Sequence, residues 1–598
     1  MSILVKLVIS IISVVGMWGW YYLTLPTLSI AHFGGFFFFG VCAFVVAINI
    51  AIWLHETEAE TIGFGLAGLV AIIWFIICIG GGFIGGSIFN ANTWQQQLGQ
   101  VEEVSFEDMI KQIDTSQIPI VDEELAEKQA DKKIGEDIAL GSRVKLGDAA
   151  IQNVNGEIMF VAPLEHAGFY EWKSNRSTPG YITVSASNPN KVEFITELEG
   201  EKIDILYQQS AYFGNNLKRK IRKEGFKTVG LTEYTFEIDD TGRPYWVVTT
   251  YENRTLWGAP EATGVVIVDA QNGETEWYSV DKAPDWVDVI QPKDFVETQI
   301  DNWGEYIHGF WNTVTAKKDM IKKTDLTLTV YVNGDCYYFT GMTSVGSDQS
   351  CVGFIMVNTR SKKAQISYMS GATEEAAMKS AEGLVSDYGY KSTEPLPVNI
   401  NGLPTYIMAL KDDEEGLIQR YAMVNVNNYN LSAYAKNLEG TKRAYLQKVA
   451  ENSSTSVVGS DEAYGYTYEG IVQRISSVVE EGSTYYYMVV EGEKDKIFMA
   501  SYMVSEELSV TRDGDTVRIT YVDDKNGTVD IISFDNIAFA TQISKQQEKR
   551  DEFDEGTSAY DDEYNQIIEV NPEMNQETWD ALTEEEKAKI IENYLNAE

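Results

Sequence analysis

The sequence predicts a multidomain protein with an N-terminal three-helix transmembrane block, followed by α+β repeats and a small all-β barrel. Three observations predict this fold class. Long apolar stretches open the chain, one series of turns and strands occurs twice in the same order, and five short strand patterns with glycine turns follow. At 598 residues the chain also exceeds the roughly 250–300 residues of a single hydrophobic core. We divide it into residues 1–95, 96–140, 141–320, 321–450, 465–540 and 541–598.

Three apolar stretches near the start of the chain have the length of membrane-spanning helices. They cover about residues 3–25, 33–54 and 62–89, and each reaches the roughly 20 residues that a helix needs to cross a bilayer. The first is too long for a signal peptide, lacks a small-residue cleavage site and precedes two more spans, so we expect it to be retained. Aromatic residues typical of bilayer interfaces lie at the ends of the spans: Trp18, Trp20, Tyr21, Tyr22, Trp53 and Trp94.

The basic residues predict how the chain is oriented in the membrane. Lys6 is the first Lys or Arg of the sequence, and the next is Lys111. Because these residues favour the cytoplasmic side, Lys6 places the N-terminus in the cytoplasm. Three spans then place the bulk of the chain, after residue 95, outside the cytoplasm. We expect an integral protein of a bacterial plasma membrane, with the envelope of a virion or mobile element as the alternative.

Glycine is concentrated in the third span. Small residues let helices approach closely, so these positions favour tight packing within one chain. A homo-oligomer formed through the transmembrane block is the alternative. The second and third spans contain no acidic or basic residue, which argues against a transporter or channel. The glycines are Gly63, Gly65, Gly68, Gly80, Gly81, Gly82, Gly85 and Gly86.

The extramembrane region contains an internal repeat. Each copy has an Asn-Gly turn, a strand led by glycine, and a Gly-x-Pro turn before an aromatic strand. Glycine supplies the turn, and the residue before proline is pushed toward extended conformations, so each Gly-x-Pro segment predicts a strand–turn–strand unit. The shared order predicts two modules of one fold. The landmarks are at 155–156, 180–184 and 242–248 in module one, and at 333–334, 353–357 and 402–408 in module two.

Module one has further features around its repeated hairpin. A helix around residues 208–223 ends at Gly225, and the strand at 264–269 leads into an Asn-Gly turn. Together with the Gly-x-Pro hairpin, these residues resemble PepSY-like domains over about residues 200–280, and over about 375–435 in module two. Module two lacks the Asp-x-x-x-Gly pattern at the last turn. The resemblance implies an extracytoplasmic binding or regulatory module, sometimes linked to peptidases, with no catalytic residues.

The hairpin aromatic residues are candidates for a peptide-binding site. An exposed sheet edge can accept an extended peptide as an added strand, with side chains beside it to provide specificity. We expect Tyr245, Trp246 and Tyr406 to line such a site.

One dense basic run lies in the predicted helix of module one. Cations near a helix C-terminus complement its dipole and can remain solvated. A contact for an anionic polymer or an acidic partner is the alternative interpretation. The run consists of Lys218, Arg219, Lys220, Arg222 and Lys223.

Two cysteines of module two are candidates for a disulfide. Cys336 follows the Asn-Gly turn and Cys351 begins the next strand, so we expect their strands to be neighbours. Disulfides persist in oxidising compartments and require Cα atoms within roughly 7 Å. An external module two therefore predicts a bridge between Cys336 and Cys351.

The other segments have patterns of their own. Residues 96–140 predict a solvated juxtamembrane linker with short helices, one from Ser105 and one at about 123–133. Residues 465–540 contain five short strands, with glycines in the first strand and before the fourth, and resemble an OB-like barrel. Residues 541–598 predict an acidic tail that ends in a helix at about 575–594.

Charge and motif content narrow the functional classes. Asp and Glu total 89 against 47 Lys and Arg, and the resulting net charge of −42 argues against nucleic-acid binding. Four cysteines and four histidines without a Cys-x-x-Cys or His-x-x-x-His pair predict no metal site, and we expect no cofactor. We find no nucleophile elbow, phosphate loop or zinc-protease motif.

These features predict a non-enzymatic, membrane-anchored binding or scaffold protein that recruits or restrains a protein partner. The expected partners are the lipid bilayer and another protein, and an envelope glycan is a further candidate. The alternative is a cell-envelope enzyme that processes glycan or peptide with a pair of carboxylates, because acidic residues are abundant.

Overall fold

The computed structural model divides the chain into two compact units, Met1–Lys448 and Val449–Glu598. It describes residues 2–57, 59–111, 118–136, 141, 143–345, 350–412, 416–453, 466–480, 483–493, 495–522, 528–538 and a few positions between 579 and 590. The first unit contains the apolar helices and both α+β modules, and the second contains the barrel.

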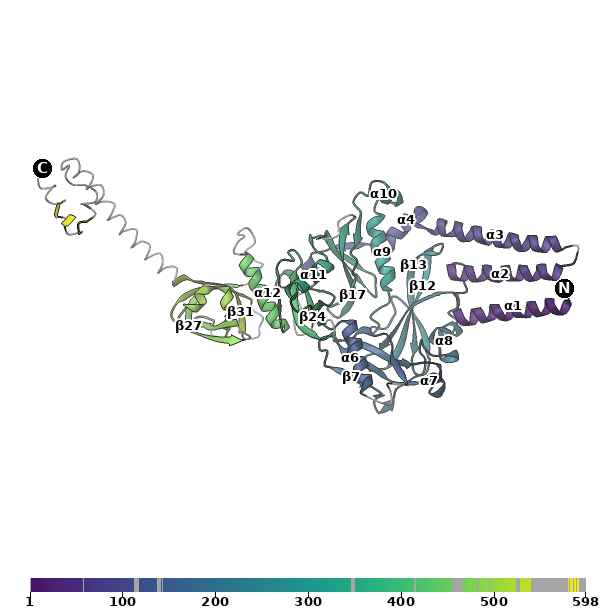
Figure 1. Cartoon of the computed structure of the whole chain (residues 1–598), viewed down its shortest axis with the longest axis horizontal. Helices are drawn as coiled ribbons and strands as arrows, with labels where there is room; N and C mark the ends of the chain where they lie inside the picture. Colours follow the sequence, from purple (N-terminus) through teal and green to yellow (C-terminus); the bar gives the residue numbers. More distant parts are fainter. Residues whose placement is uncertain are drawn as a thin grey trace. The chain divides into compact units, whose positions relative to one another are not determined.

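The three predicted membrane spans are confirmed as long apolar helices (Figure 1). Their length and hydropathy suffice to cross a bilayer, while the short α4 (Ser87–Gln95) continues the third predicted stretch beyond a break at Gly86. Lys6 donates to the carbonyl oxygens of Trp53, at 3.2 Å, and His55, at 2.9 Å, at the end of the second helix. The helices are α1 (Ile3–Thr24), α2 (Phe33–Leu54) and α3 (Glu60–Gly85).

Module one consists of two antiparallel sheets with a helix against them. The first sheet has the order β2–β4–β6–β7, with β3 paired to β4, and the second has the order β11–β12–β13–β14. Side chains from both sheets and from α8 (Leu217–Lys223) share one hydrophobic core. The strands are β2 (Val144–Leu146), β3 (Ala150–Val154), β4 (Glu157–His166), β6 (Tyr181–Ser185), β7 (Val192–Ile195), β11 (Gly230–Ile238), β12 (Pro244–Thr255), β13 (Gly258–Asp269) and β14 (Thr275–Ser279).

Module two has the same plan. Its first sheet has the order β1–β20–β19–β17–β15, with β16 paired to β17, and its second has the order β22–β24–β25–β26, with β23 paired to β24. Helix α11 (Glu374–Leu384) contributes to the core between the sheets. The strands are β1 (Val101–Glu103), β15 (Ile321–Lys323), β16 (Leu328–Val332), β17 (Asp335–Ser344), β19 (Gly353–Asn358), β20 (Ala364–Ser367), β22 (Lys391–Ser392), β23 (Leu396–Ile400), β24 (Leu403–Lys411), β25 (Ile418–Asn425) and β26 (Ser432–Ala435).

The repeated landmarks occupy equivalent places in the two modules. The Asn-Gly pairs at 155–156 and 333–334 have positive φ at both residues and form the two-residue turns of the β3–β4 and β16–β17 hairpins. Gly242 and Gly402, with φ of 87° and 80°, end the turns of the β11–β12 and β23–β24 hairpins. The predicted duplication is therefore present as a common order of strands.

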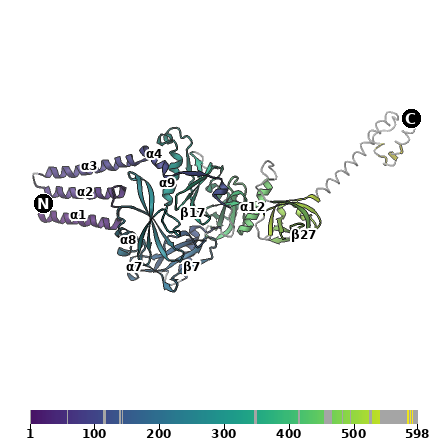
Figure 2. The ribbon, with the colours of Figure 1, turned by 180° about the vertical axis from the view of Figure 1, so that it is seen from behind.

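The tip of the β12–β13 hairpin packs against the membrane helices. Trp257 donates to the Ile30 carbonyl at 2.9 Å, and a Cβ at Gly81 would collide with its ring. A Cβ at Gly85 would likewise collide with the main chain of Leu256. These two glycines of α3 thus serve packing within the chain, as predicted, and both views show the hairpin reaching the helices (Figures 1 and 2).

Residues 96–140 are not a solvated spacer, which corrects the prediction. The predicted helices are present as α5 (Phe106–Met109), capped by Ser105, and α6 (Glu123–Gly135), but both are buried on one side. Strand β1 pairs in parallel with β20, and Phe106 and Met109 enter the core of module two. The apolar face of α6 packs on the first sheet of module one instead. The segment therefore holds both modules, and residues 112–117 and 137–140 lie outside the described part.

A closed five-stranded barrel forms the described core of the second unit. Its order is β27–β28–β29–β31–β30, and β29 and β31 run parallel. All five predicted strands are present, and Gly470 allows the close approach of Val490. The predicted terminal helix at 575–594 is described only at scattered positions, and most of it lies outside the described residues. The barrel strands are β27 (Tyr466–Glu480), β28 (Ser483–Val490), β29 (Ile497–Ser501), β30 (Thr516–Val522) and β31 (Thr528–Asn536).

Replacing Gly81 with valine should weaken the packing of the hairpin on α3, because the new side chain meets the Trp257 ring. Overpacking of this kind typically costs about 1–3 kcal/mol. We expect a lower thermal midpoint for the full chain in detergent, followed by tryptophan fluorescence. Gly82→Val is the matched control, because no atom lies within 4 Å of a Cβ there. Equal midpoints for the two variants would contradict the packing role of Gly81.

Candidate binding cleft between the two modules

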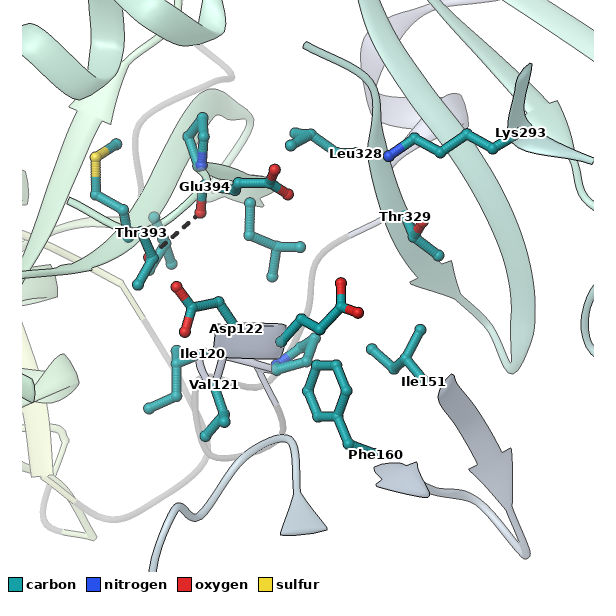
Figure 3. Close-up of a pocket in the computed structure, with 16 residues that line it drawn as sticks. Ile120, Val121, Asp122, Ile151, Phe160, Lys293, Leu328, Thr329, Thr393 and Glu394 are labelled. Atoms are coloured by element: carbon teal, nitrogen blue, oxygen red, sulfur yellow. Dashed lines mark hydrogen bonds between the residues drawn. The ribbon is translucent and has the colours of Figure 1, made fainter. Parts of the chain in front are cut away.

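A cavity of about 190 Å³ lies where module one, module two and the segment before α6 meet (Figure 3). It is smaller than the roughly 300–1,000 Å³ of typical small-molecule pockets. Residues 119–123, 393–396, strands β3 and β16, and the start of α9 (Lys293–Glu305) all contribute to its lining. Segments far apart in the sequence therefore form one cleft.

The floor of the cleft is apolar and comes from both modules. Ile151 and Phe160 belong to the first sheet of module one, and Leu328 lies on β16 of module two. Leu396, on the edge strand β23, and Met408, on the neighbouring β24, add part of the second sheet of module two. Phe160 and Leu328 are also buried parts of the two hydrophobic cores, so the floor is a continuation of packed structure.

The rim of the cleft carries carboxylates with one ammonium group. Burial raises the pKa of Glu123, and the nearby charges of Glu127 and Asp148 add to that effect. Burial also raises the pKa of Glu394, although Lys293 opposes the shift. The Lys293 side chain points toward the side of the cavity where Glu394 lies (Figure 3). Within the described part of the chain, neither Glu123 nor Glu394 forms an ion pair within 4.0 Å.

Asp122 differs from the other rim acids because its contacts are structural. One oxygen accepts from the Leu125 main-chain N at 3.0 Å and caps α6. The other lies 2.7 Å from Lys411 Nζ, which also contacts Glu124 at 3.0 Å. Hydrogen bonds from Lys128 and Lys411 lower the pKa of Glu124 to about 2. Lys411 therefore attaches the segment before α6 to module two and fixes one wall of the cleft.

A buried group of polar contacts joins β3 of module one to the β16–β17 hairpin of module two, beside the cleft. Asp288 accepts from the Asn153 main-chain N at 2.6 Å and lies 3.1 Å from the Tyr331 hydroxyl. Asn153 also donates to the Gly334 carbonyl at 3.0 Å, so β3 and the β16–β17 turn are joined directly. Burial raises the pKa of Asp288 to about 6 and that of Glu237 beside it to about 8. These carboxyl groups sit inside the junction, and their contacts position the modules.

The predicted peptide-binding role is wrong for two of the three residues. Trp246 and Tyr406 occupy the same position in the two repeats, four residues after Gly242 and Gly402, and both point into the core of their own module. Their exposures are 2% and 0%, and the Trp246 indole donates to the Tyr207 carbonyl at 2.8 Å. A side chain packed between two sheets cannot contact a peptide at the edge.

Tyr245 points the other way and lines a separate cavity of about 370 Å³. Its ring stacks on Trp286 with centroids 5.1 Å apart. The acid beside it, Asp269, accepts from Arg243 Nε at 2.7 Å and from the main-chain N of Gln271 and Asn272 at 2.8 and 3.0 Å. Asp269 thus holds the turn after β13, and this cavity is lined by aromatic rings and carboxylates.

The predicted basic run is largely engaged with the first membrane helix. Arg219 donates to the Tyr22 carbonyl at 2.7 Å, and its guanidinium lies 3.8 Å above the Tyr22 ring. Lys218 donates to the Thr24 carbonyl at 3.2 Å. Lys220 forms an ion pair with Glu224, the residue that follows α8. Lys223 is exposed. Helix α8 is thus fixed to the end of α1. The prediction that these basic side chains simply remain solvated is wrong.

The predicted disulfide is also wrong, because Cys336 and Cys351 are free and buried. Cys336 pairs with Tyr331 in the β16–β17 hairpin. Cys351 lies on β18 (Ser350–Cys351), and its sulfur would meet a Cβ at Gly341, five residues beyond Cys336 on β17. At about 3.3 Å per residue, that is roughly 16 Å along the strand, more than the roughly 7 Å limit for a disulfide.

The sequence patterns did not predict the residues that line the cleft. Glu123, Lys293, Thr329 and Glu394 come from four distant segments, and none lies in a motif. The one local signal is Asp122, which precedes the predicted helix as an N-cap residue. Only the placement of the modules brings these side chains together.

Comparisons with known proteins identify no family for the chain. No family model matches. No curated protein matches either. Among solved structures, a mutant levansucrase from Bacillus megaterium is 9% identical, with 73% of this chain and 96% of that chain covered and a TM-score of 0.18. Trypanosoma rangeli sialidase is 8% identical (69% and 58% covered, TM-score 0.16), and an arabinanase from a bovine ruminal metagenomic library is 8% identical (64% and 96% covered, TM-score 0.14). Similarities this low carry no conclusion about fold or function.

Stability of the first unit should fall as the pH rises through the range set by Glu237. The pKa of this carboxyl rises from 4.5 to about 8 in the fold, so the folded state retains a proton that the unfolded chain releases. Its contribution is complete below about pH 4.5 and declines toward pH 8, at about 1.4 kcal/mol per pKa unit. Glu237→Gln, which is neutral at every pH, should flatten the fall in thermal midpoint between pH 5 and 8. The exposed Glu375→Gln should keep the wild-type slope, and a Glu237→Gln protein that also keeps it would contradict this assignment.

Proposed function

We propose that the protein is a membrane-anchored, non-enzymatic scaffold that recruits or restrains another protein through the cleft between its two modules. One observation carries the proposal: an apolar floor from both modules lies beneath two exposed rim carboxylates, Glu123 and Glu394, which form no ion pair within 4.0 Å in the described part of the chain. Carboxylates without such a partner can bind a cation supplied by a ligand.

The cleft suits a short segment of a protein chain. A cavity of about 190 Å³ is small for a metabolite and fits individual side chains. An apolar side chain on the floor would contribute about 1.5–3 kcal/mol when fully buried. A neighbouring lysine or arginine would reach Glu123 and Glu394 at the rim. The expected ligand is therefore an extended protein segment in which a basic residue stands beside an apolar one.

The domain resemblances belong to the same proposal. A helix packed on a four-stranded antiparallel sheet with a glycine hairpin supports PepSY-like modules, which would act in binding or regulation. The barrel order β27–β28–β29–β31–β30, with β29 and β31 parallel, supports an OB-like barrel. We propose no nucleic-acid ligand for the barrel, because the chain is strongly acidic.

A second candidate concerns the Tyr245 cavity. The stacked rings of Tyr245 and Trp286 lie beside the carboxylates of Glu274 and Glu276, a combination that favours contact with a sugar. An envelope glycan bound there would attach the protein to the envelope at a second site. If the protein hydrolysed that glycan, the scaffold hypothesis would give way to the alternative of an enzyme that uses a pair of carboxylates.

We also propose that the bulk of the chain faces the outside of a bacterial plasma membrane. The orientation rests on Lys6, whose contacts with Trp53 and His55 show that the charge also serves to cap α2. Tyr388, 58% exposed in module two, offers a reporter: after Tyr388→Cys in a Cys42→Ala/Cys78→Ala background, a membrane-impermeant maleimide should label intact cells. Labelling only after lysis would reverse the orientation.

Neutralising the rim should release the partner. A photo-crosslinking residue at Thr329, which lines the cavity, should join the protein to its partner in the native host membrane. Loss of a charged hydrogen bond costs about 1.5–3 kcal/mol, so Glu123→Gln/Glu394→Gln should lower the crosslink yield by roughly tenfold or more. The control Glu193→Gln/Glu375→Gln removes two exposed acids elsewhere.

The outcome separates the candidate functions. A crosslinked partner segment with adjacent basic and apolar residues, lost in the rim variant alone, supports the scaffold. A rim variant that crosslinks as well as the wild type would remove the cleft from the proposal. Purified full chain that releases sugars from an envelope glycan would replace the scaffold by the enzyme.

A further inference from the structure

A basic and aromatic surface surrounds the end of the first membrane helix. We define the juxtamembrane patch as residues 169–176 and 212–227, which comprise α7 (Phe169–Ser174), the turn before α8, and α8 with the residues after it. It contains eight Lys and Arg residues against two Glu, in a chain whose net charge is −42. The patch thus has the opposite sign to the protein as a whole.

Direct contacts fix the depth of the patch relative to the membrane. Besides the bonds from Lys218 and Arg219, the Arg222 guanidinium donates to the Thr27 hydroxyl at 3.0 Å. The Leu28 main-chain N donates to the Lys227 carbonyl at 2.7 Å. Because these partners lie where α1 ends, α8 sits at the level where the apolar span gives way to the aqueous phase.

Exposed aromatic side chains adjoin the basic helix. Tyr170 is 77% exposed and Phe213 is 54% exposed, although both rings belong to a cluster around Trp172. The Arg219 side chain donates to the Phe213 carbonyl at 3.3 Å, which joins the cluster to α8. Figures 1 and 2 both show α7 and α8 on the side from which the three apolar helices emerge. Exposed aromatic rings at this level are typical of a bilayer interface.

We propose that the juxtamembrane patch rests on the bilayer surface and binds the headgroups of anionic phospholipids. Lys223 and Lys227 are exposed beside the end of α1 and supply cations free of any ion pair among the described residues. The aromatic rings insert at the headgroup level while the cations meet lipid phosphates, as in polybasic membrane contacts. An acidic protein is less suited to this surface, because the bilayer already lies beside it and would occupy the aromatic rings.

The experiment follows one label in the full chain. Tyr170→Cys in a Cys42→Ala/Cys78→Ala background carries an environment-sensitive fluorophore, and the protein is reconstituted in nanodiscs of phosphatidylcholine, with or without phosphatidylglycerol. Quenching by acrylamide should be about twofold or more weaker in the anionic discs than in the neutral discs. A label at Tyr388, 58% exposed in module two, should be quenched equally in both.

Charge reversal tests the headgroup contact itself. Lys223→Glu/Lys227→Glu should abolish the lipid-dependent protection, since these two side chains make no contact that holds α8 to α1 in the described structure. The matched control Lys132→Glu/Lys363→Glu changes the net charge equally at exposed lysines elsewhere and should retain the protection. A thermal midpoint equal to wild type shows that the reversed protein is folded.

Three results would overturn the proposal. Equal quenching at position 170 in neutral and anionic discs would exclude anionic lipid as the ligand. Protection in neutral discs on adding soluble glycerol phosphate would indicate a site for a free phosphate. Protection that requires polyglutamate, whatever the lipid, would indicate a surface for an acidic protein.

Discussion

The packing of the extramembrane modules directly onto the ends of the membrane helices is the constraint on which the first unit depends. Trp257 lies against Gly81 of α3, and α8 donates to the last carbonyl groups of α1. The carbonyls at a helix C-terminus have no partner within the helix, so basic side chains from α8 satisfy groups that burial would otherwise leave unpaired. Module one is consequently fixed to the ends of these helices instead of being joined to them by a flexible linker alone.

Duplication explains why the cleft lies between the modules. Each copy buries the aromatic residue of its hairpin, Trp246 or Tyr406, between its own sheets, so neither ring can contact a peptide. The cleft lies instead on the surface where the copies meet, at β3 and β16. The polar junction of Asp288 with Asn153 and Tyr331 sets their separation there. Buried polar contacts of this kind specify one arrangement, because any shift would leave a desolvated group unpaired.

Local sequence patterns were sufficient to predict the helices and strands. They were insufficient to predict which parts of the chain each one packs against. Apolar runs of bilayer length, Asn-Gly turns and Gly-x-Pro hairpins are decided within a few residues, and the spans, hairpins and barrel strands follow them. The prediction for residues 96–140 was wrong because their many charges indicated a solvent-exposed segment. In the structure, the apolar side of α6 and the pair Phe106 and Met109 are buried against modules that follow in the sequence. The same holds for Cys336 and Cys351, since neighbouring strands do not imply neighbouring positions along them.

A strongly acidic chain gains a specific advantage from placing one cluster of cations beside the membrane. Surface carboxylates of a protein with a net charge of −42 are repelled by anionic lipid, and over distances beyond about 8–10 Å that repulsion is screened by physiological salt. Only the side of the modules nearest the bilayer lies within that range, and there the sequence places Lys218, Arg219, Arg222 and Lys223. Three of these residues already bind the end of α1. Charge segregation therefore combines an acidic exterior with a basic surface at the end of α1.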